Sequence, residues 1–152
     1  MPSSPIRADD MPTQKTTTKH LEQVVHECGR YPIEAFEFVR RGLTYTVEQV
    51  HGKRKSHDPD DQSYHVSGQQ LCWGLRNYAF ARYGHLAYAV LAHWNILRTS
   101  DFGRIVFAMI DSKLMAKTDD DNIRDFNDVY DLATAFNPPT RPHNTPQTIF
   151  RI

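Results

Sequence analysis

Apolar residues recur at three- and four-residue steps through most of residues 17–113, which is the period of an α-helix that buries one face. The pattern is interrupted at Gly29, Gly52 and Gly84 and by a stretch without apolar residues at 51–63. Between these breaks the periodicity predicts five helices, over residues 17–28, 33–50, 68–82, 85–97 and 101–113.

Three of the predicted helix ends carry suitable capping residues. Pro32 suits the first position of the second helix, where its missing N–H costs no hydrogen bond. Ser67, followed three residues later by Gln70, predicts a capping box at the start of the third helix. Gly29 suits the left-handed exit of the first helix.

The apolar face of each helix predicts which residues share the core. Val50 continues the stripe of the second helix, and Leu86 is expected to point inward from the fourth. Residues of four helices are expected to be buried together: Phe36, Leu43, Leu75, Val90, Trp94, Ile105, Val106 and Met109.

Residues 117–133 allow two interpretations. Ile123, Phe126 and Tyr130 fit a helical period, which predicts a sixth short helix. Asn127-Asp128 also resembles the turn of a small β-hairpin. The sequence leaves both alternatives open.

Both ends of the chain lack helical periodicity. Residues 1–13 hold three prolines and no apolar pattern, which indicates a disordered arm. Four prolines between residues 137 and 147 exclude regular structure there. A chain of 152 residues is one domain's worth. We therefore expect a single, mainly α domain over 14–136, a compact bundle of five to six helices, with a Pro-rich tail over 137–152.

The tail ends on apolar residues, where a solvated segment is normally polar. Ile149, Phe150 and Ile152 stand among Thr148 and Arg151. Such a segment can add a strand to an exposed sheet edge, or place Phe150 in a groove on a partner or a second copy. A mobile end that happens to carry apolar side chains is the other interpretation.

Charge is balanced over the chain but uneven along it. Eighteen basic and eighteen acidic residues give a formal net charge of zero, without the basic excess typical of chains that coat nucleic acid or anionic membranes. A basic patch is expected from Arg40, Arg41, Lys53, Arg54 and Lys55. An acidic patch is expected from Asp119, Asp120, Asp121, Asp125, Asp128 and Asp131.

The cellular compartment is predicted from the kinds of apolar segment that the sequence lacks. No apolar run follows the N-terminus as it does in a signal peptide, and none approaches the roughly 20 residues that span a bilayer. We expect a cytoplasmic protein without a membrane partner. Cys28 and Cys72 fall inside predicted helices and are expected to be small buried apolar groups.

Candidate metal ligands lack the spacing that metal sites use. His51, His57 and His65 are six and eight residues apart, whereas zinc ligands occur in closer pairs. A calcium loop that began at Asp119 would need glycine at its sixth position and glutamate at its twelfth, and the chain has neither. No nucleophile or phosphate-binding motif occurs. We therefore expect no metal, no cofactor and no catalytic residue.

Several short runs resemble those of a known family. They are HVSGQQL at 65–71, YG at 83–84, WNI at 94–96 and TSDFGRIVF at 99–107, and residues 31–39, 117–118 and 130–136 are similar too. These runs resemble a bacterial family restricted to planctomycetes and verrucomicrobia, over about residues 19–136. The resemblance implies the limits of the domain and a bacterial cytoplasmic origin. It implies no activity, cofactor or catalytic residue.

These observations favour a non-enzymatic protein-interaction module, whose opposite charge patches would steer a partner or a second copy. The alternative is RNA or DNA binding through the basic patch at 40–57, in a winged-helix-like arrangement with residues 101–113 as the reading helix. That helix would expose a mixture of charges, including Asp101 and Arg104, and its wing would be acidic, which opposes phosphate binding. A metal-dependent enzyme is the most distant alternative.

The predicted core can be tested at Ile105. Replacing Ile105 with Asp is expected to abolish folding, because an unpaired buried carboxylate costs several kcal/mol, roughly the whole stability of a small domain. Far-ultraviolet circular dichroism and thermal melting measure the loss. A soluble Ile105→Asp variant with a native spectrum and melting temperature would contradict the core assignment.

Overall fold

The computed structural model describes residues 14–52 and 65–136, and all the elements found there are helical. The predicted arm and tail lie outside these described residues. The α-helices are α1 (Gln14–Cys28), α2 (Ile33–His51), α3 (Gly68–Tyr83), α4 (Ala87–His93), α5 (Thr99–Asp111) and α6 (Leu132–Phe136). Two 3-10 helices, η3 (Gly84–Leu86) and η4 (Ile123–Phe126), join them. The prediction of a mainly α fold is confirmed.

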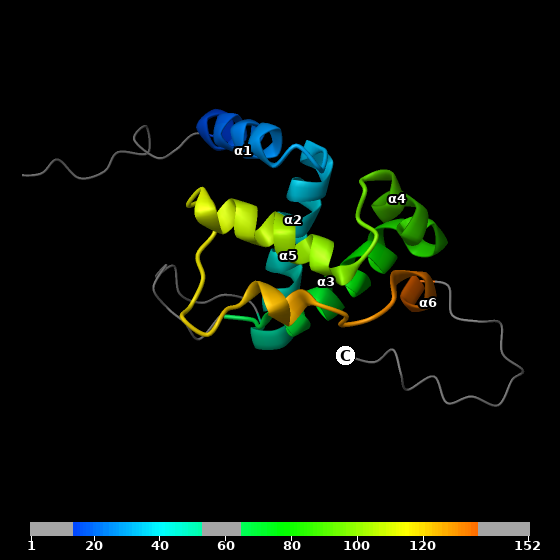
Figure 1. Cartoon of the computed structure of the whole chain (residues 1–152). Helices are drawn as coiled ribbons and strands as arrows, with labels where there is room; N and C mark the ends of the chain where they lie inside the picture. The colour runs from blue at the N-terminus through cyan, green and yellow to red at the C-terminus, as the bar shows by residue number, and fades with distance from the viewer. Residues whose placement is uncertain (1–13, 53–64, 137–152) are drawn as a thin grey trace, which may run out of the picture.

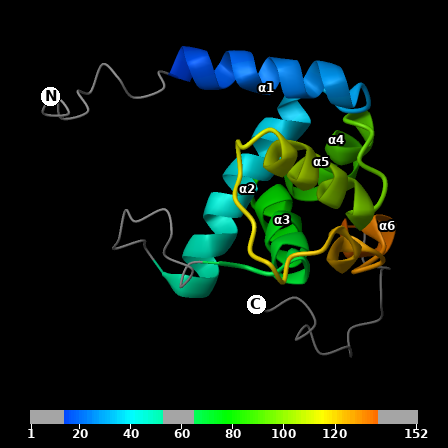
Figure 2. The same cartoon turned by 60° about the vertical axis from the view of Figure 1, so that its left-hand side comes forward.

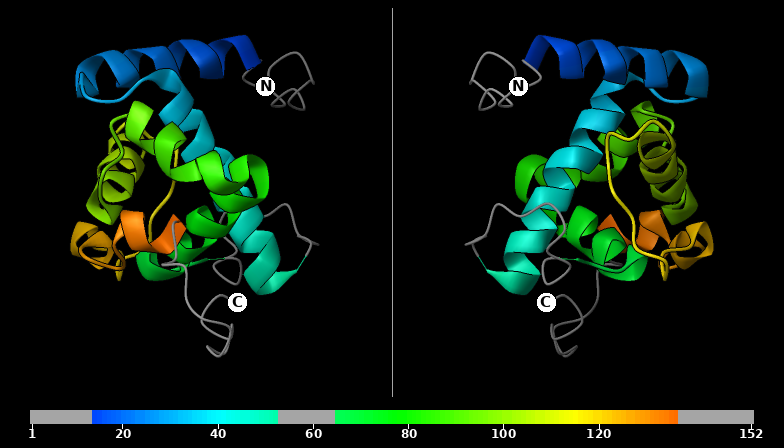
Figure 3. Two further views of the ribbon diagram at one scale, coloured as in Figure 1. Left: turned by 90° about the vertical axis from the view of Figure 1, so that its right-hand side faces the viewer. Right: turned by 90° about the vertical axis from the view of Figure 1, so that its left-hand side faces the viewer.

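The helices form a bundle around α3 and α5. Helix α1 lies across the start of α2 at one end of the molecule (Figure 1, Figure 2). Helix α2 runs down one side and packs along α3, while α5 crosses both of them. The segment from η4 to α6 closes the opposite end, beside α3 (Figure 3).

The observed helix boundaries agree closely with those predicted, except in the fourth helix. The first helix begins at Gln14, three residues before the predicted start. The fourth was expected over 85–97, but 84–86 form a 3-10 turn and the α-helix ends at His93. Asn95 then takes a left-handed conformation, with φ of 62°. Local periodicity did not reveal this turn, because the apolar residues continue through it.

The predicted capping box at the start of α3 is confirmed. The backbone N–H of Gln70 donates to Ser67 Oγ at 3.1 Å, and the backbone N–H of Ser67 donates to Gln70 Oε1 at 2.9 Å. These bonds satisfy two backbone donors that the first turn of a helix leaves open. Gly29 has φ of 64°, as expected for the exit of α1.

One apolar cluster draws on all six α-helices and on η4. Five of the eight residues expected in the core are buried, and Leu43, Val90 and Trp94 are partly buried. The expectation for Leu86 is wrong, since 68% of its surface is exposed. A 3-10 helix has three residues per turn instead of 3.6, so η3 rotates Leu86 out of the predicted stripe. Val50 is exposed because the last turn of α2 extends past the helices that cover its middle (Figure 2).

Residues 117–133 form neither the hairpin nor a single helix through Ile123, Phe126 and Tyr130, but two separate helical pieces. Ile123–Phe126 form η4 and Leu132–Phe136 form α6, and the described stretch 65–136 contains no strand. Asn122 caps η4, since its Oδ1 accepts the Arg124 backbone N–H at 3.0 Å. The turn at Asn127-Asp128 therefore links two helical pieces, with Asp128 at a φ of 49°.

Helices α2 and α3 approach closely because two glycines face their neighbours. A Cβ atom added at Gly42 would collide with the side chain of Leu75. One added at Gly74 would lie 2.6 Å from Thr46 Cβ, and Thr46 also blocks it with its hydroxyl and methyl groups. The Thr46 hydroxyl donates to the Gly42 carbonyl at 2.7 Å, so this buried polar group is satisfied within α2.

Phe126 fills the space between the start of α3 and the side of α5. Added Cβ atoms at Gly68 and Gly103 would each lie 2.9 Å from its atoms. The Thr99 hydroxyl donates to the Phe126 carbonyl at 2.6 Å and accepts the Val129 backbone N–H at 3.1 Å. Gly68 and Gly103 leave room for Phe126, and the buried hydroxyl of Thr99 binds the backbone of Phe126 and Val129. Together they hold η4 against the bundle.

The contact between α2 and α3 predicts an unusual response at Gly74. Alanine is preferred to glycine inside a helix by about 1 kcal/mol, so helix propensity alone predicts that Gly74→Ala stabilises the protein. We expect destabilisation by roughly 1–3 kcal/mol instead, because the new methyl group overpacks against Thr46. Urea unfolding measures the difference. A Thr46→Gly change should restore part of the loss, and a single Gly74→Ala variant more stable than wild type would contradict the described packing.

Candidate functional site

The most deeply buried charged group in the described residues is Asp101, at the first turn of α5. Asp101 is 4% exposed, although the nucleic-acid alternative places it on an exposed face, and that expectation is wrong. One carboxylate oxygen accepts the backbone N–H groups of Leu97 and Arg98, at 2.8 and 3.0 Å. The carboxylate points inward because these two hydrogen bonds hold it against the loop between α4 and α5.

The other oxygen of Asp101 connects this loop to the turn between α1 and α2. It accepts a short hydrogen bond from the Tyr31 hydroxyl and an ion-pair contact from Arg104 Nη1 at 3.2 Å. Burial, together with the bond to Asp101, raises the pKa of Tyr31 to about 12. Tyr31 therefore stays protonated at neutral pH and acts as a hydrogen-bond donor, not as a base. These contacts are structural in character.

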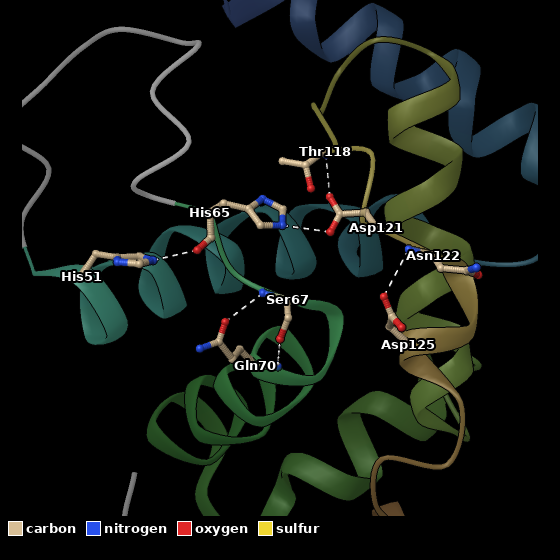
Figure 4. A network of polar contacts seen from close by, with 8 residues as sticks. All are labelled: His51, His65, Ser67, Gln70, Thr118, Asp121, Asn122 and Asp125. Atoms are coloured by element: carbon tan, nitrogen blue, oxygen red, sulfur yellow. Dashed lines mark hydrogen bonds and ion pairs between the residues drawn. The ribbon is translucent and has the colours of Figure 1, made fainter.

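A second polar cluster joins the residues on either side of 53–64 (Figure 4). His51, at the end of α2, donates through Nε2 to the backbone carbonyl of His65 at 2.7 Å. His65 in turn donates through Nε2 to Asp121 Oδ1 at 2.9 Å, and Asp121 Oδ2 accepts the Thr118 backbone N–H at 2.8 Å. The cluster ties α2, the start of α3 and the segment after α5 together.

The six aspartates of the predicted acidic patch all lie between α5 and α6, and three of them have internal partners. Asp121 belongs to the cluster of Figure 4. Asp125 accepts the Asn122 backbone N–H at 3.2 Å, and Asp131 accepts the Ala133 N–H and the Thr134 hydroxyl at the start of α6. Asp119, Asp120 and Asp128 are exposed. The stretch is therefore both a set of helix and turn caps and a negative surface.

The predicted basic patch is only partly described. Arg40 is half-buried and Arg41 exposed, both in the middle of α2. Lys53, Arg54 and Lys55 lie outside the described residues. The winged-helix-like arrangement also needs a strand hairpin after α5, and residues 112–136 form turns, η4 and α6 instead.

In the described part of the chain, the Cys72 thiol is unreactive and the metal-binding side chains are not gathered into a metal site. Burial raises the pKa of the Cys72 thiol to about 12, so Cys72 is a small apolar group, as predicted, and not a thiolate nucleophile. Cys28 is only half-buried, so the expectation of a buried group is wrong for this residue. No group of three or more metal-binding side chains comes together among residues 14–52 and 65–136. His57 lies outside these residues.

The outward face of α3 carries two large aromatic side chains in an otherwise well-buried helix. Trp73 and Phe80 are seven residues apart, so they share one direction, and they are 40% and 39% exposed. The ring centre of Trp73 lies 4.8 Å from that of Tyr130, and the Arg76 guanidinium lies 5.3 Å from the ring centre of Phe80. We call Trp73, Asn77, Phe80 and Tyr130 the aromatic face.

Two polar residues lie within or beside this face. Arg76 donates to the Ala135 carbonyl at 3.4 Å and to Asn77 Oδ1 at 2.8 Å, which places α6 beside the middle of α3. The side-chain amide nitrogen of Asn77 is buried and has no hydrogen-bond partner among the described residues. Such unsatisfied donors are few in native proteins.

The sequence predicted Leu75 of α3 in the core, but the outer aromatic pair of this helix was not predicted. The seven-residue spacing of Trp73 and Phe80 was visible, yet large aromatics in a dense apolar segment normally belong to the core. Only the packing of α2 against α3 decides which aromatic residues of α3 face outward.

The chain matches no protein-family model, no curated protein and no solved structure. The resemblance to the planctomycete and verrucomicrobial family therefore remains a prediction. Within residues 14–52 and 65–136, no helix has the length and apolar character needed to cross a membrane.

The Tyr31–Asp101 pair predicts a specific dependence of stability on pH. An unfolded chain ionises Tyr31 near pH 10, whereas the folded protein keeps it neutral to about pH 12. Because the folded pKa is raised, the contribution of Tyr31 is complete below pH 10 and is lost as pH rises from about 10 to about 12. We expect Tyr31→Phe to be less stable than wild type by roughly 1–2 kcal/mol at neutral pH, with the difference shrinking across that window.

Urea unfolding of the two proteins at several pH values measures this difference. Tyr88, which is half-buried and has no role in the pair, provides a control as Tyr88→Phe. A stability difference between wild type and Tyr31→Phe that stays constant up to about pH 12 would show that Tyr31 ionises alike in both states.

Proposed function

We propose that the domain is a non-enzymatic protein-interaction module that binds its partner through the aromatic face of α3. The observation that carries the proposal is the exposure of Trp73 and Phe80 on one side of a helix whose other side is buried. Scattered exposed apolar residues are normal on any protein. Trp73 and Phe80, at a seven-residue spacing, expose two aromatic rings on the same side of α3, and the ring of Tyr130 packs beside that of Trp73.

The composition of this surface is that of a binding site. Tryptophan, tyrosine and arginine supply most of the energetically dominant contacts in protein interfaces. Rigid rings lose little conformational entropy when they are covered, which favours them over flexible apolar side chains. Arg76 packs against Phe80 and holds α6 through the Ala135 carbonyl. The face is therefore rigid before a partner arrives.

The polar clusters support the same proposal by their chemistry. The carboxylates of Asp101 and Asp121 each accept a backbone N–H group that ends a loop or begins a turn. Tyr31 is held neutral because burial raises its pKa. A general acid or base needs access to a substrate, and the carboxylates of Asp101 and Asp121 are already engaged with other groups of the fold. Binding is accordingly favoured over catalysis.

The test is a double substitution on the aromatic face. Trp73→Ser with Phe80→Ser is expected to weaken partner binding or self-association by at least about tenfold, since each ring is the kind of residue that dominates an interface. Sedimentation velocity reports self-association, and quantitative capture of partners from the source cell reports binding to other proteins.

The double variant is compared with a control substitution of another exposed apolar residue. Leu97 is 55% exposed in the loop between α4 and α5, so Leu97→Ser removes a similar exposed apolar group from a different part of the fold. It should leave binding unchanged. Circular dichroism confirms that each variant is folded. If the double variant binds as tightly as Leu97→Ser and wild type, the aromatic face is not the interface.

A further inference from the structure

We propose that the aromatic face of α3 is covered, within the same molecule, by the apolar segment 148–152 of the chain's own tail. This inference rests on the proposed function, because it names the occupant of the same surface in the absence of a partner. The segment supplies Ile149, Phe150 and Ile152, which are, prolines aside, the only large apolar residues after Phe136. A partner would then have to displace it.

The tail leaves the described fold next to the aromatic face. Helix α6 ends at Phe136, and the carbonyl of Ala135 accepts hydrogen bonds from the guanidinium of Arg76, in the middle of α3. Trp73 lies one turn before Arg76 on this helix and Phe80 one turn after it. The attachment point of the tail is therefore beside the surface that it is proposed to cover.

The connection to the apolar residues is long enough to reach across this surface. Residues 137–148 separate Phe136 from Ile149, and four of them are prolines, which favour an extended chain of about 3.1 Å per residue. Fully extended, this connection reaches about 37 Å, several times the rise of roughly 10 Å between Trp73 and Phe80 along α3. A tether of this length keeps the segment at an effective concentration of about millimolar, which favours its own domain over a second copy.

Charge also favours this occupant. Residues 137–152 contain Arg141 and Arg151 and no acidic residue. Asp128 and Asp131 are exposed and lie within two residues of Tyr130, whose ring packs against Trp73. Arg151, between Phe150 and Ile152, would approach these carboxylates as its neighbours cover the rings. Complementary charge of this kind fixes orientation more than affinity.

The test follows the exposure of Trp73 in the full chain. A Trp94→Phe background makes Trp73 the only fluorescent indole, and acrylamide quenching then reports its accessibility. Changing Ile149, Phe150 and Ile152 to Ser is expected to raise the quenching constant about twofold, because the ring loses its cover. The matched control changes Thr145 and Gln147 to Ala in the same tail and should leave quenching unchanged. Circular dichroism confirms folding in each case.

Three results would overturn the inference. Equal quenching in the tail variant and its parent would show that the segment does not cover Trp73. An increase in quenching of the same size in the Thr145 and Gln147 control would show that the effect does not depend on the apolar residues of the tail. Protection that falls on dilution over about a hundredfold range would place a second copy's tail on the face. None of these results removes partner binding through Trp73 and Phe80, so the proposed function is tested separately.

Discussion

The contact between Gly74 and Thr46 sets the orientation of α3, and the aromatic face depends on that orientation. Because Gly74 has no side chain, α3 can lie directly against α2 with Thr46 filling the gap. Leu71 and Leu75 then face the core, and Trp73 and Phe80 face outward. A rotation of α3 by one residue, about 100°, would exchange buried and exposed side chains.

Polar side chains inside this small bundle serve mainly to hold irregular backbone in place. Asp101, Asp121 and Thr99 all accept backbone N–H groups from loops between helices. Buried backbone donors cost free energy when they are left unpaired. The described helices are joined by turns and 3-10 segments, so such donors are common here. Asp101 and three of the six aspartates of the acidic patch thus serve the structure of the fold.

The aromatic face and the proposed tail contact form one functional hypothesis. A rigid apolar surface that is exposed in isolation invites non-specific association. A weakly held segment of the same chain would cover it until a better partner competes, and attachment to the same domain would make that cover effective without high intrinsic affinity. Selectivity would then come from the contacts a partner makes beyond those of the tail.

The sequence by itself determined the helical class, most helix boundaries and the capping box at Ser67, because periodicity and caps act over a few neighbouring residues. Five of the eight predicted core residues are buried for the same reason. Only the tertiary structure decided that Asp101 is buried, that Leu86 is exposed and that His65 meets Asp121. Those outcomes depend on contacts between segments far apart in the chain and on the close approach that Gly42 and Gly74 permit, and no local pattern of residues encodes the rotation of one helix against another.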